Sequence, residues 1–188
     1  FKMKIIGITG LIASGKTTVA KLMSGKKYPL FSADIIVSNL YKKKKFNRIL
    51  IKKFKLSGKE KAKDQIKAIL KKNKNYLYKL ESIIHPLVRK EMLKFLSKKK
   101  KMIFLEIPLL LESKLNRYFD KIIFVGAKRN LRLKRYLKKP GDKDTFSLLD
   151  KRQLSPNKKK KICDYVINNN YSLAILKKNV KNFMKNYE

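Results

Sequence analysis

The sequence is poor in the residues that several protein classes require. Its 188 residues include one cysteine, Cys163, and one histidine, His85, which excludes an internal disulfide and argues against a zinc site built from cysteine and histidine. No apolar run approaches the ~20 residues that span a bilayer. The first residues lack the apolar length and the small-residue cleavage site of a signal peptide. We therefore expect a soluble protein of the cytoplasm.

Acidic residues are also scarce, with 13 Asp and Glu against 50 Lys and Arg, and the formal net charge is +37. Such an excess raises the affinity for nucleic acid and other polyanions. Apart from short runs at 42–45, 98–101 and 158–161, however, the lysines are spread along the whole chain. Since Lys and Asn codons are rich in adenine, an AT-rich genome produces the same bias. The charge alone predicts no more than non-specific nucleic-acid binding, and it leaves the oligomeric state open.

Hydrophobic residues nevertheless make up 44% of the chain, enough for one compact domain. Short apolar, β-branched runs predict strands, and longer stretches with helical spacing separate them. Strands alternating with helices predict an α/β fold with a parallel sheet covered on both faces. Pro86 is expected near a helix start. We predict strands at 4–9, 29–34, 101–108, 120–125 and 165–168. Helices are predicted at 18–23, 35–79 with a break at Ser57-Gly58, 80–96, 129–139, 144–154 and 173–187.

The segment after the first predicted strand matches the phosphate-binding pattern G-x-x-x-x-G-K-[ST]. Its glycines, Gly10 and Gly15, allow successive backbone N–H groups to turn toward phosphate oxygens. Lys16 places an ammonium group on the β and γ phosphates, and the Thr17 hydroxyl is suited to ligate Mg²⁺. The helix that follows presents its N-terminus to the same anion. The residues predicted to bind ATP here are Gly10, Ala13, Ser14, Gly15, Lys16, Thr17 and Thr18.

A phosphate loop occurs in GTPases, motors, helicases and small-molecule kinases. The sequence has no N-K-x-D motif for guanine, and motors and helicases are normally longer. Glu106 ends an apolar strand, the position where a carboxylate holds Mg²⁺ directly or through water. A short chain with a basic, lid-like segment suits phosphoryl transfer to a small acceptor.

Four further segments, in order along the chain, resemble the dephospho-CoA kinases. They are Ser32-Ala33-Asp34, His85-Pro86-Leu87-Val88-Arg89, Pro108-Leu109-Leu110-Leu111-Glu112, and a late group made of Gln153, Lys159 and Cys163 to Asn169. The resemblance covers almost the whole chain. It implies a P-loop kinase core at about 1–36, 84–128 and 159–188, a helical acceptor-binding region at about 37–83 and a lid at about 129–158. It also implies transfer of the γ-phosphoryl group of ATP to the ribose 3′-hydroxyl of dephospho-CoA, the last step of coenzyme A biosynthesis.

By this resemblance, Asp34 lies near the acceptor hydroxyl, orients it and accepts its proton. The alternative for Asp34 is an N-cap of the helix that follows. His85 and Arg89 are four residues apart, hence on one helix face, and the resemblance makes them acceptor-binding residues. Alternatively, His85 satisfies a backbone carbonyl and Arg89 pairs with Glu81 or Glu112.

The predicted lid is basic. Arg129, Arg132 and Arg135 recur at three-residue spacing, roughly on one helix face. The family has two lid arginines four residues apart, and Arg135 and Lys139 fit that spacing best. This implies that Arg135 stabilises the transferred phosphoryl group and that Lys139 helps to bind ATP without the bidentate contact of an arginine. A solvated basic face is the alternative. Asn169 is predicted in a turn near the adenine, where an ordinary strand-end turn would look the same.

The chain departs from the family at several positions. Leu11 and Ala13 stand in a loop that is usually richer in glycine, Ser32 replaces an aspartate and Leu111 replaces a phenylalanine. Residues 41–75 align poorly. Two other functions stay open: a transferase like the tRNA dimethylallyltransferases, which have a similar loop, and a nucleic-acid-binding ATPase. The former are considerably longer, and dispersed lysines without aromatic clusters argue against the latter.

Overall fold

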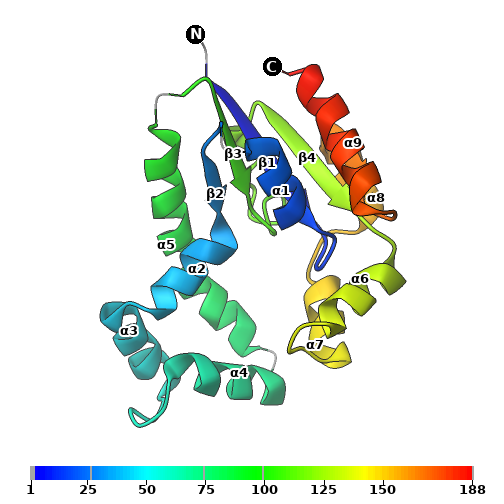
Figure 1. Ribbon diagram of the computed structural model, residues 1–188. Coiled ribbons are helices and arrows are strands. Elements are labelled where there is room, and N and C mark those ends of the chain that lie inside the picture. Colours follow the sequence, from blue (N-terminus) through cyan, green and yellow to red (C-terminus); the bar gives the residue numbers. More distant parts are fainter. Residues whose placement is uncertain (1–2, 26, 74, 99, 188) are drawn as a thin grey trace. The chain divides into compact units, whose positions relative to one another are not determined.

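The computed structural model describes residues 3–25, 27–73, 75–98 and 100–187, with Lys71 described by its backbone alone (Figure 1). The chain forms two compact units. The first contains Phe1–Ser32 and Lys99–Glu188, and the second contains Ala33–Lys98. The predicted acceptor-binding region, 37–83, falls within the second unit, which extends further at both ends.

The first unit is built on a parallel sheet. Its strands in the described residues are β1 (Lys4–Gly10), β2 (Leu30–Ser32), β3 (Met102–Glu106), β4 (Lys121–Gly126) and β5 (Tyr165–Asn168). They lie in the order β2-β3-β1-β4-β5, and each neighbouring pair is parallel. The central strands are apolar and β-branched because both of their faces are buried. The predicted α/β fold is therefore confirmed.

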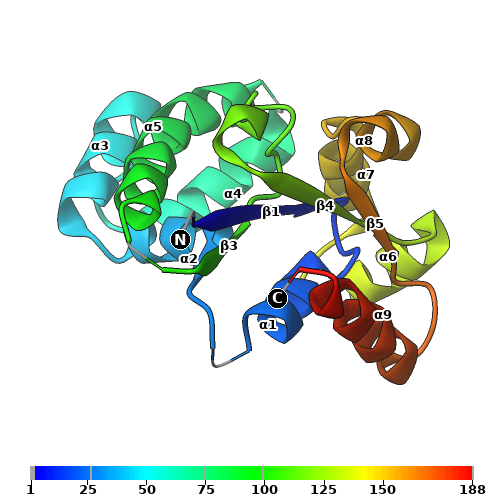
Figure 2. The ribbon, with the colours of Figure 1, turned by 90° about the horizontal axis from the view of Figure 1, so that it is seen from above.

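Helices cover both faces of this sheet (Figure 2). On one face, α1 (Lys16–Ser24) and α9 (Leu173–Lys185) lie side by side. On the other face lie α8 (Pro156–Ile162) and a segment that contains the short 3₁₀ helix η1 (Asn116–Tyr118). The core under α1 and α9 includes Ile6, Ile8, Val19, Met23, Phe104, Ile123, Val180 and Phe183.

Two helices follow the carboxyl end of β4. They are α6 (Arg129–Leu137), which lies within the predicted range, and α7 (Lys143–Lys151), which begins one residue before the predicted 144–154. Phe146 is fully buried between them, with its ring centroid 5.5 Å from that of Tyr136. The next helix, α8, is not predicted by the sequence pattern, which shows only the lysine run 158–161. Pro156 in its first turn and the Ser155 hydroxyl, which accepts the N–H of Lys158, explain where it begins.

The second unit is helical and has its own apolar core. Its helices are α2 (Ala33–Tyr41), α3 (Lys44–Phe54), α4 (Ala62–Lys72) and α5 (Tyr76–Leu96), and the predicted break at Ser57-Gly58 separates α3 from α4. α2 packs against α5. The core contains Leu40, Phe46, Leu50, Phe54, Ala62, Ile66, Leu80 and Ile84.

Two local predictions are wrong. Pro86 lies in the middle of α5 rather than near a helix start. An interior proline costs a helix about 3 kcal/mol, but α5 stays continuous because buried residues from Leu80 to Met92 anchor it on both sides. β2 ends at Ser32, so Asp34 is the second residue of α2 and not the end of a strand. Within the described ranges, every helix is too short or too polar to traverse a lipid bilayer.

Candidate active site

The phosphate loop joins β1 to α1 in a conformation that few side chains permit. Gly15 has a φ of 95° and Ala13 a φ of 56°, both in the left-handed region. A Cβ atom at Gly15 would overlap the side-chain amide of Asn169, and one at Gly10 would lie 2.6 Å from the carbonyl oxygen of Val125. Both motif glycines are therefore required by the close approach of neighbouring groups. Ala13 adopts its conformation at a cost of about 1–2 kcal/mol.

The loop keeps several backbone donors for a ligand. Within the described part of the chain, the N–H groups of Ala13, Gly15 and Thr17 donate to no acceptor. Together with the N-terminus of α1 they form a group of backbone donors suited to an anion. The Lys16 side chain belongs to the same turn and is 9% exposed. The geometry therefore fits the predicted phosphate site.

Two buried polar atoms beside the loop, Ser14 Oγ and Arg135 Nη1, lack a hydrogen-bond partner among the described residues. Arg135 Nη2 donates to the carbonyl oxygen of Asn169 at 2.9 Å, and Asn169 Nδ2 donates to the carbonyl oxygen of Ser14 at 2.9 Å. Arg135, Asn169 and the loop thus form one connected group. Because an unsatisfied buried polar atom costs about 1–3 kcal/mol, these two atoms indicate that the site accommodates a polar ligand.

Glu106 is fully buried at the end of β3, next to the loop. Its Oε1 accepts from Thr17 Oγ1 at 2.7 Å, and its Oε2 accepts from Ser32 Oγ at 2.8 Å. Because the Thr17 hydroxyl donates its hydrogen bond to Glu106, its oxygen lone pairs remain available to a cation. A carboxylate at position 32 would repel Glu106, whereas the Ser32 hydroxyl satisfies it.

The oxygen atoms of Thr17 and Glu106 suit a cation that keeps most of its water ligands. No three His, Cys, Asp or Glu side chains gather into a metal site in the described ranges. Mg²⁺ is usually held by one or two protein oxygens together with substrate phosphates and water. Thr17 and Glu106 are therefore the residues that could hold it.

The predicted basic face of α6 is not uniform. The Arg132 side chain is 4% exposed, its guanidinium lies 2.6 Å from an Asp150 carboxylate oxygen, and it reaches the carbonyl oxygen of Ile12 at 3.4 Å. Arg129 is 61% exposed and lies 3.5 Å from the same carboxylate. Arg132 therefore does not belong to a solvated face. Lys139 is exposed beyond the end of α6.

Three predicted site residues belong to the second unit. Asp34 is exposed in the first turn of α2, and His85 and Arg89 are exposed on α5. His85 makes no hydrogen bond within the described residues, so it does not satisfy a backbone carbonyl there. Since α2 packs against α5, these helices hold Asp34, His85 and Arg89 in one unit.

Three side chains contact the loop or its surroundings without a role assigned from sequence. Gln153 accepts the N–H of Ile12 at 2.7 Å and donates to the carbonyl oxygen of Gly10 at 3.2 Å. Lys159 is fully buried and pairs with Glu112 at 2.9 Å. Gln153, Lys159 and Glu112 all lie in segments that resemble the kinase family. That resemblance is the sequence signal from which a role for them could have been predicted.

Two titrating groups lie just before β5. Burial raises the pKa of the Cys163 thiol to about 11, although nearby Lys159 opposes the shift. Burial also raises the pKa of Asp164, but hydrogen bonds from the N–H of Ile122 and from Lys121 outweigh it and leave this pKa below its usual value. Cys163 is therefore a thiol and Asp164 a carboxylate at neutral pH.

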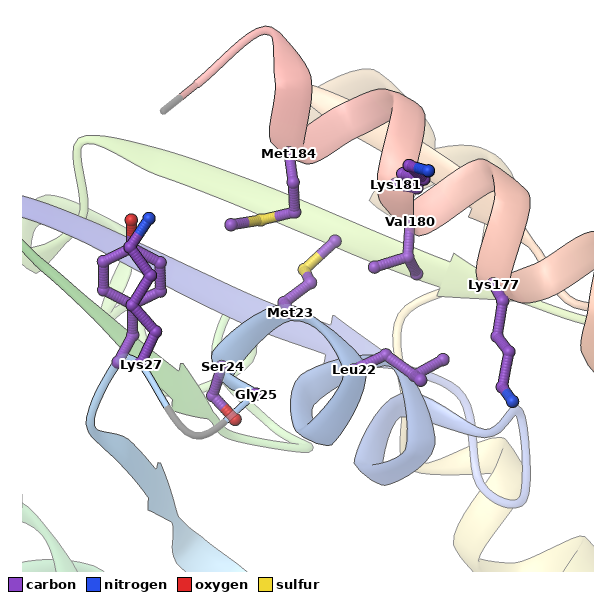
Figure 3. A pocket seen from close by; sticks show the side chains of 10 residues that line it. Leu22, Met23, Ser24, Gly25, Lys27, Lys177, Val180, Lys181 and Met184 are labelled. Atoms are coloured by element: carbon purple, nitrogen blue, oxygen red, sulfur yellow. The ribbon is translucent and has the colours of Figure 1, made fainter.

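A separate hollow of about 300 Å³ opens between α1 and α9. Met23, Val180 and Met184 point into the space between the two helices, as Figure 3 shows. The residues from α1 are those at its C-terminal end, opposite the phosphate loop. The proportion of lysine among the residues that line this hollow is similar to its proportion in the whole chain. The charge of the hollow therefore does not indicate a ligand site.

Comparison with known proteins identifies relatives over nearly the whole chain. The family model for dephospho-CoA kinase matches residues 4–174. A protein of Fusobacterium nucleatum named dephospho-CoA kinase is 37% identical over 186 residues, which cover 95% of this chain and 96% of that protein. A Bartonella quintana protein of the same name is 32% identical and covers 98% of both chains.

Solved structures show the same fold. TT1252 from Thermus thermophilus superposes with a TM-score of 0.80 at 26% identity over the full length of both chains. Dephospho-CoA kinase from Campylobacter jejuni has a TM-score of 0.65 at 23% identity, covering 98% of this chain and 97% of that one. The family match and the near full-length relatives above 30% identity show that this chain belongs to the dephospho-CoA kinase family.

Proposed function

We propose that this chain transfers the γ-phosphoryl group of ATP to the ribose 3′-hydroxyl of dephospho-CoA and so completes coenzyme A synthesis. The full-length match to dephospho-CoA kinases carries the proposal. The phosphate loop supports it, because its available N–H groups are the donors that a triphosphate requires. A cytoplasmic location belongs to the same proposal, since the lone Cys163 suits a reducing compartment.

ATP is bound by the loop and by the residues connected to it. Lys16 and the loop N–H groups hold the β and γ phosphates, with Thr18 in the first turn of α1. Ser14 Oγ and Arg135 Nη1, both buried without a partner among the described residues, are available to the nucleotide. Arg135 stabilises charge on the phosphoryl group during transfer, and Lys139 adds a second cation.

A magnesium ion is the proposed cofactor, held by Thr17 and Glu106. When bound, it neutralises charge on the β and γ phosphates. Glu106 accepts a hydrogen bond from Thr17 Oγ1 at 2.7 Å, so the lone pairs of that hydroxyl oxygen would be available to the cation. Ser32 completes the hydrogen bonding of the buried carboxylate at 2.8 Å and keeps it oriented.

The acceptor is handled by the second unit. Asp34 orients the 3′-hydroxyl and accepts its proton as the new bond to phosphorus forms. Its exposed position in the first turn of α2 supports this role, because a substrate can reach its carboxyl group there. His85 and Arg89, both exposed on α5, contact the anionic groups of dephospho-CoA.

The reaction is tested by measuring ADP and coenzyme A formed from ATP and Mg²⁺ with dephospho-CoA, with RNA or with no acceptor. Equal amounts of both products with dephospho-CoA alone are expected. ADP release stimulated by RNA would instead support a nucleic-acid-dependent ATPase or an RNA-modifying transferase. Binding of RNA that vanishes as salt rises would be incidental electrostatics from the +37 charge.

The role of Asp34 is tested by Asp34→Asn. We expect turnover to fall by roughly 10²-fold or more with little change in ATP affinity, in line with the loss of a general base. Lys16→Ala should instead weaken both ATP binding and turnover. Glu91→Gln is the matched control, since Glu91 lies on α5 and pairs with exposed Lys94 at 3.5 Å. Near wild-type turnover of Asp34→Asn would remove Asp34 from the mechanism.

A further inference from the structure

The carbonyl oxygens of the phosphate loop are almost fully occupied. The backbone N–H of Ser14 donates to Leu11 at 3.1 Å, and that of Val19 donates to Gly15 at 3.1 Å. Side chains donate to the three remaining bonded carbonyls: Gln153 to Gly10 at 3.2 Å, Arg132 to Ile12 at 3.4 Å and Asn169 to Ser14 at 2.9 Å. The loop is thus held from its carbonyl side by residues more than a hundred positions later in the sequence.

This arrangement fixes where the N–H groups point. A peptide unit is planar, and its N–H and C=O point in opposite directions. Binding a carbonyl on the outer side of the loop therefore turns the N–H of the same peptide toward the inner side. By this geometry Arg132 on the Ile12 carbonyl and Asn169 on the Ser14 carbonyl orient the N–H groups of Ala13 and Gly15. The Gln153 amide acts at the start of the loop, where it accepts the N–H of Ile12 at 2.7 Å and donates to the carbonyl oxygen of Gly10. Gln153 thereby fixes two successive peptide units of the loop before the ligand arrives.

The side chains that hold the loop are themselves held. Arg132 is 4% exposed and pairs with Asp150 at 2.6 Å. The residue after Gln153 donates its backbone N–H to Glu112 at 2.8 Å, and Glu112 is fixed by buried Lys159. A loop supported by such a network loses less conformational freedom when it binds a phosphate.

We propose that Gln153, assisted by Arg132, is a positioning residue for the nucleotide phosphates that acts through the backbone of the phosphate loop. The inference rests on the proposed function, namely that this loop binds ATP. Gln153 lies just beyond α7, so it also links the α6–α7 segment to the phosphate site. The role differs from the predicted lid cations, because the Gln153 amide is engaged by the loop itself.

Gln153→Met tests this role, because Met keeps the unbranched shape and removes both hydrogen bonds. We expect the dissociation constant for ATP, measured by calorimetry without acceptor, to rise about tenfold, as two modest hydrogen bonds would produce. The KM for ATP should rise with it, whereas the KM for dephospho-CoA should stay within about twofold. Ser155→Ala is the control: it removes the N-cap of α8, two residues away, without a contact to the loop.

ATP affinity of Gln153→Met within twofold of the wild type would overturn the proposal. So would an equal loss in Gln153→Met and Ser155→Ala, because that result would reflect general destabilisation of the segment. If Gln153→Met does not fold, Gln153→Glu is the second variant, because it retains the acceptor for the N–H of Ile12 and loses the bond to Gly10. An ATP affinity of Gln153→Glu equal to that of the wild type would also overturn the proposal. Failure of the wild type to bind ATP would instead refute the proposed function of the loop.

Discussion

The buried pair of Lys159 and Glu112 gives the sharpest prediction about stability. Lys159 is fully buried, and its Nζ lies 2.9 Å from one Glu112 oxygen, with the Thr9 hydroxyl and the Pro108 carbonyl as its other neighbours, each at 3.4 Å. Glu112 is 14% exposed and also accepts the N–H of Leu154. Glu112→Gln keeps the shape and that acceptor and removes the charge alone.

Glu112→Gln and Lys159→Met should lower the free energy of unfolding by different amounts. At an effective dielectric constant near 20, charges 2.9 Å apart attract by about 6 kcal/mol, which roughly balances the desolvation of two buried ions. Glu112→Gln leaves an ammonium group with no access to water and should cost about 3–5 kcal/mol. Lys159→Met leaves a carboxylate that retains some solvent and the Leu154 N–H, so the expected loss is about 1–3 kcal/mol. The double variant that combines Glu112→Gln with Lys159→Met should be more stable than Glu112→Gln alone.

Thermal and urea unfolding, followed by circular dichroism, measure these differences. For a chain of this length, about 3 kcal/mol corresponds to a Tm decrease of roughly 6–12 °C. Lys160→Met is the control, since Lys160 is exposed in the same helix and its loss changes the net charge equally; it should stay within about 0.5 kcal/mol of the wild type. Additive losses in the double variant would refute the reasoning, because they would mean that the two charges do not interact.

Further predictions concern the metal site and the two titrating groups. Glu106→Gln should raise the Mg²⁺ concentration for half-maximal activity by about tenfold or more, and an unchanged magnesium titration would exclude Glu106 from the metal site. Because the pKa of Asp164 is lowered in the folded state, its carboxylate stabilises the fold above the pKa of the unfolded chain. Asp164→Asn should therefore lower the free energy of unfolding by about 1 kcal/mol at pH 7, after allowance for solvent screening, and urea titrations should show the difference vanish as pH falls through the folded pKa. With a Cys163 pKa of about 11, alkylation by iodoacetamide should accelerate about tenfold per pH unit up to pH 10, and a plateau near pH 8 would contradict the burial argument.

The sheet and the phosphate loop could be predicted because their signals are local. A strand buried on both faces requires an apolar run, and β5 has the predicted bounds, Tyr165–Asn168. The loop motif requires glycine where another group approaches the backbone, as Asn169 does at Gly15. Both signals are properties of a few consecutive residues, so distant contacts do not obscure them.

The roles of the cations could not be predicted, because they depend on distant partners. Lys159 is the second residue of a run of four lysines, and its neighbours Lys158 and Lys160 are exposed. Which of them is buried depends on how α8 lies on the sheet and on Glu112, 47 positions earlier. Arg132 likewise differs from its neighbours through Asp150. Composition explains the abundance of lysine but not its placement.

The phosphate-binding conformation is not a property of the glycine motif alone. Leu11 and Ala13 stand in a loop that is richer in glycine in the family, and Ala13 still adopts a φ of 56°. The carbonyl side of the loop is held by Arg132, Gln153 and Asn169, and the energy of these contacts is of the order needed to offset a left-handed alanine. Glycine is then needed only where another group touches the backbone. The segment from α6 to the end of β5 is therefore as much a part of the phosphate site as the motif itself.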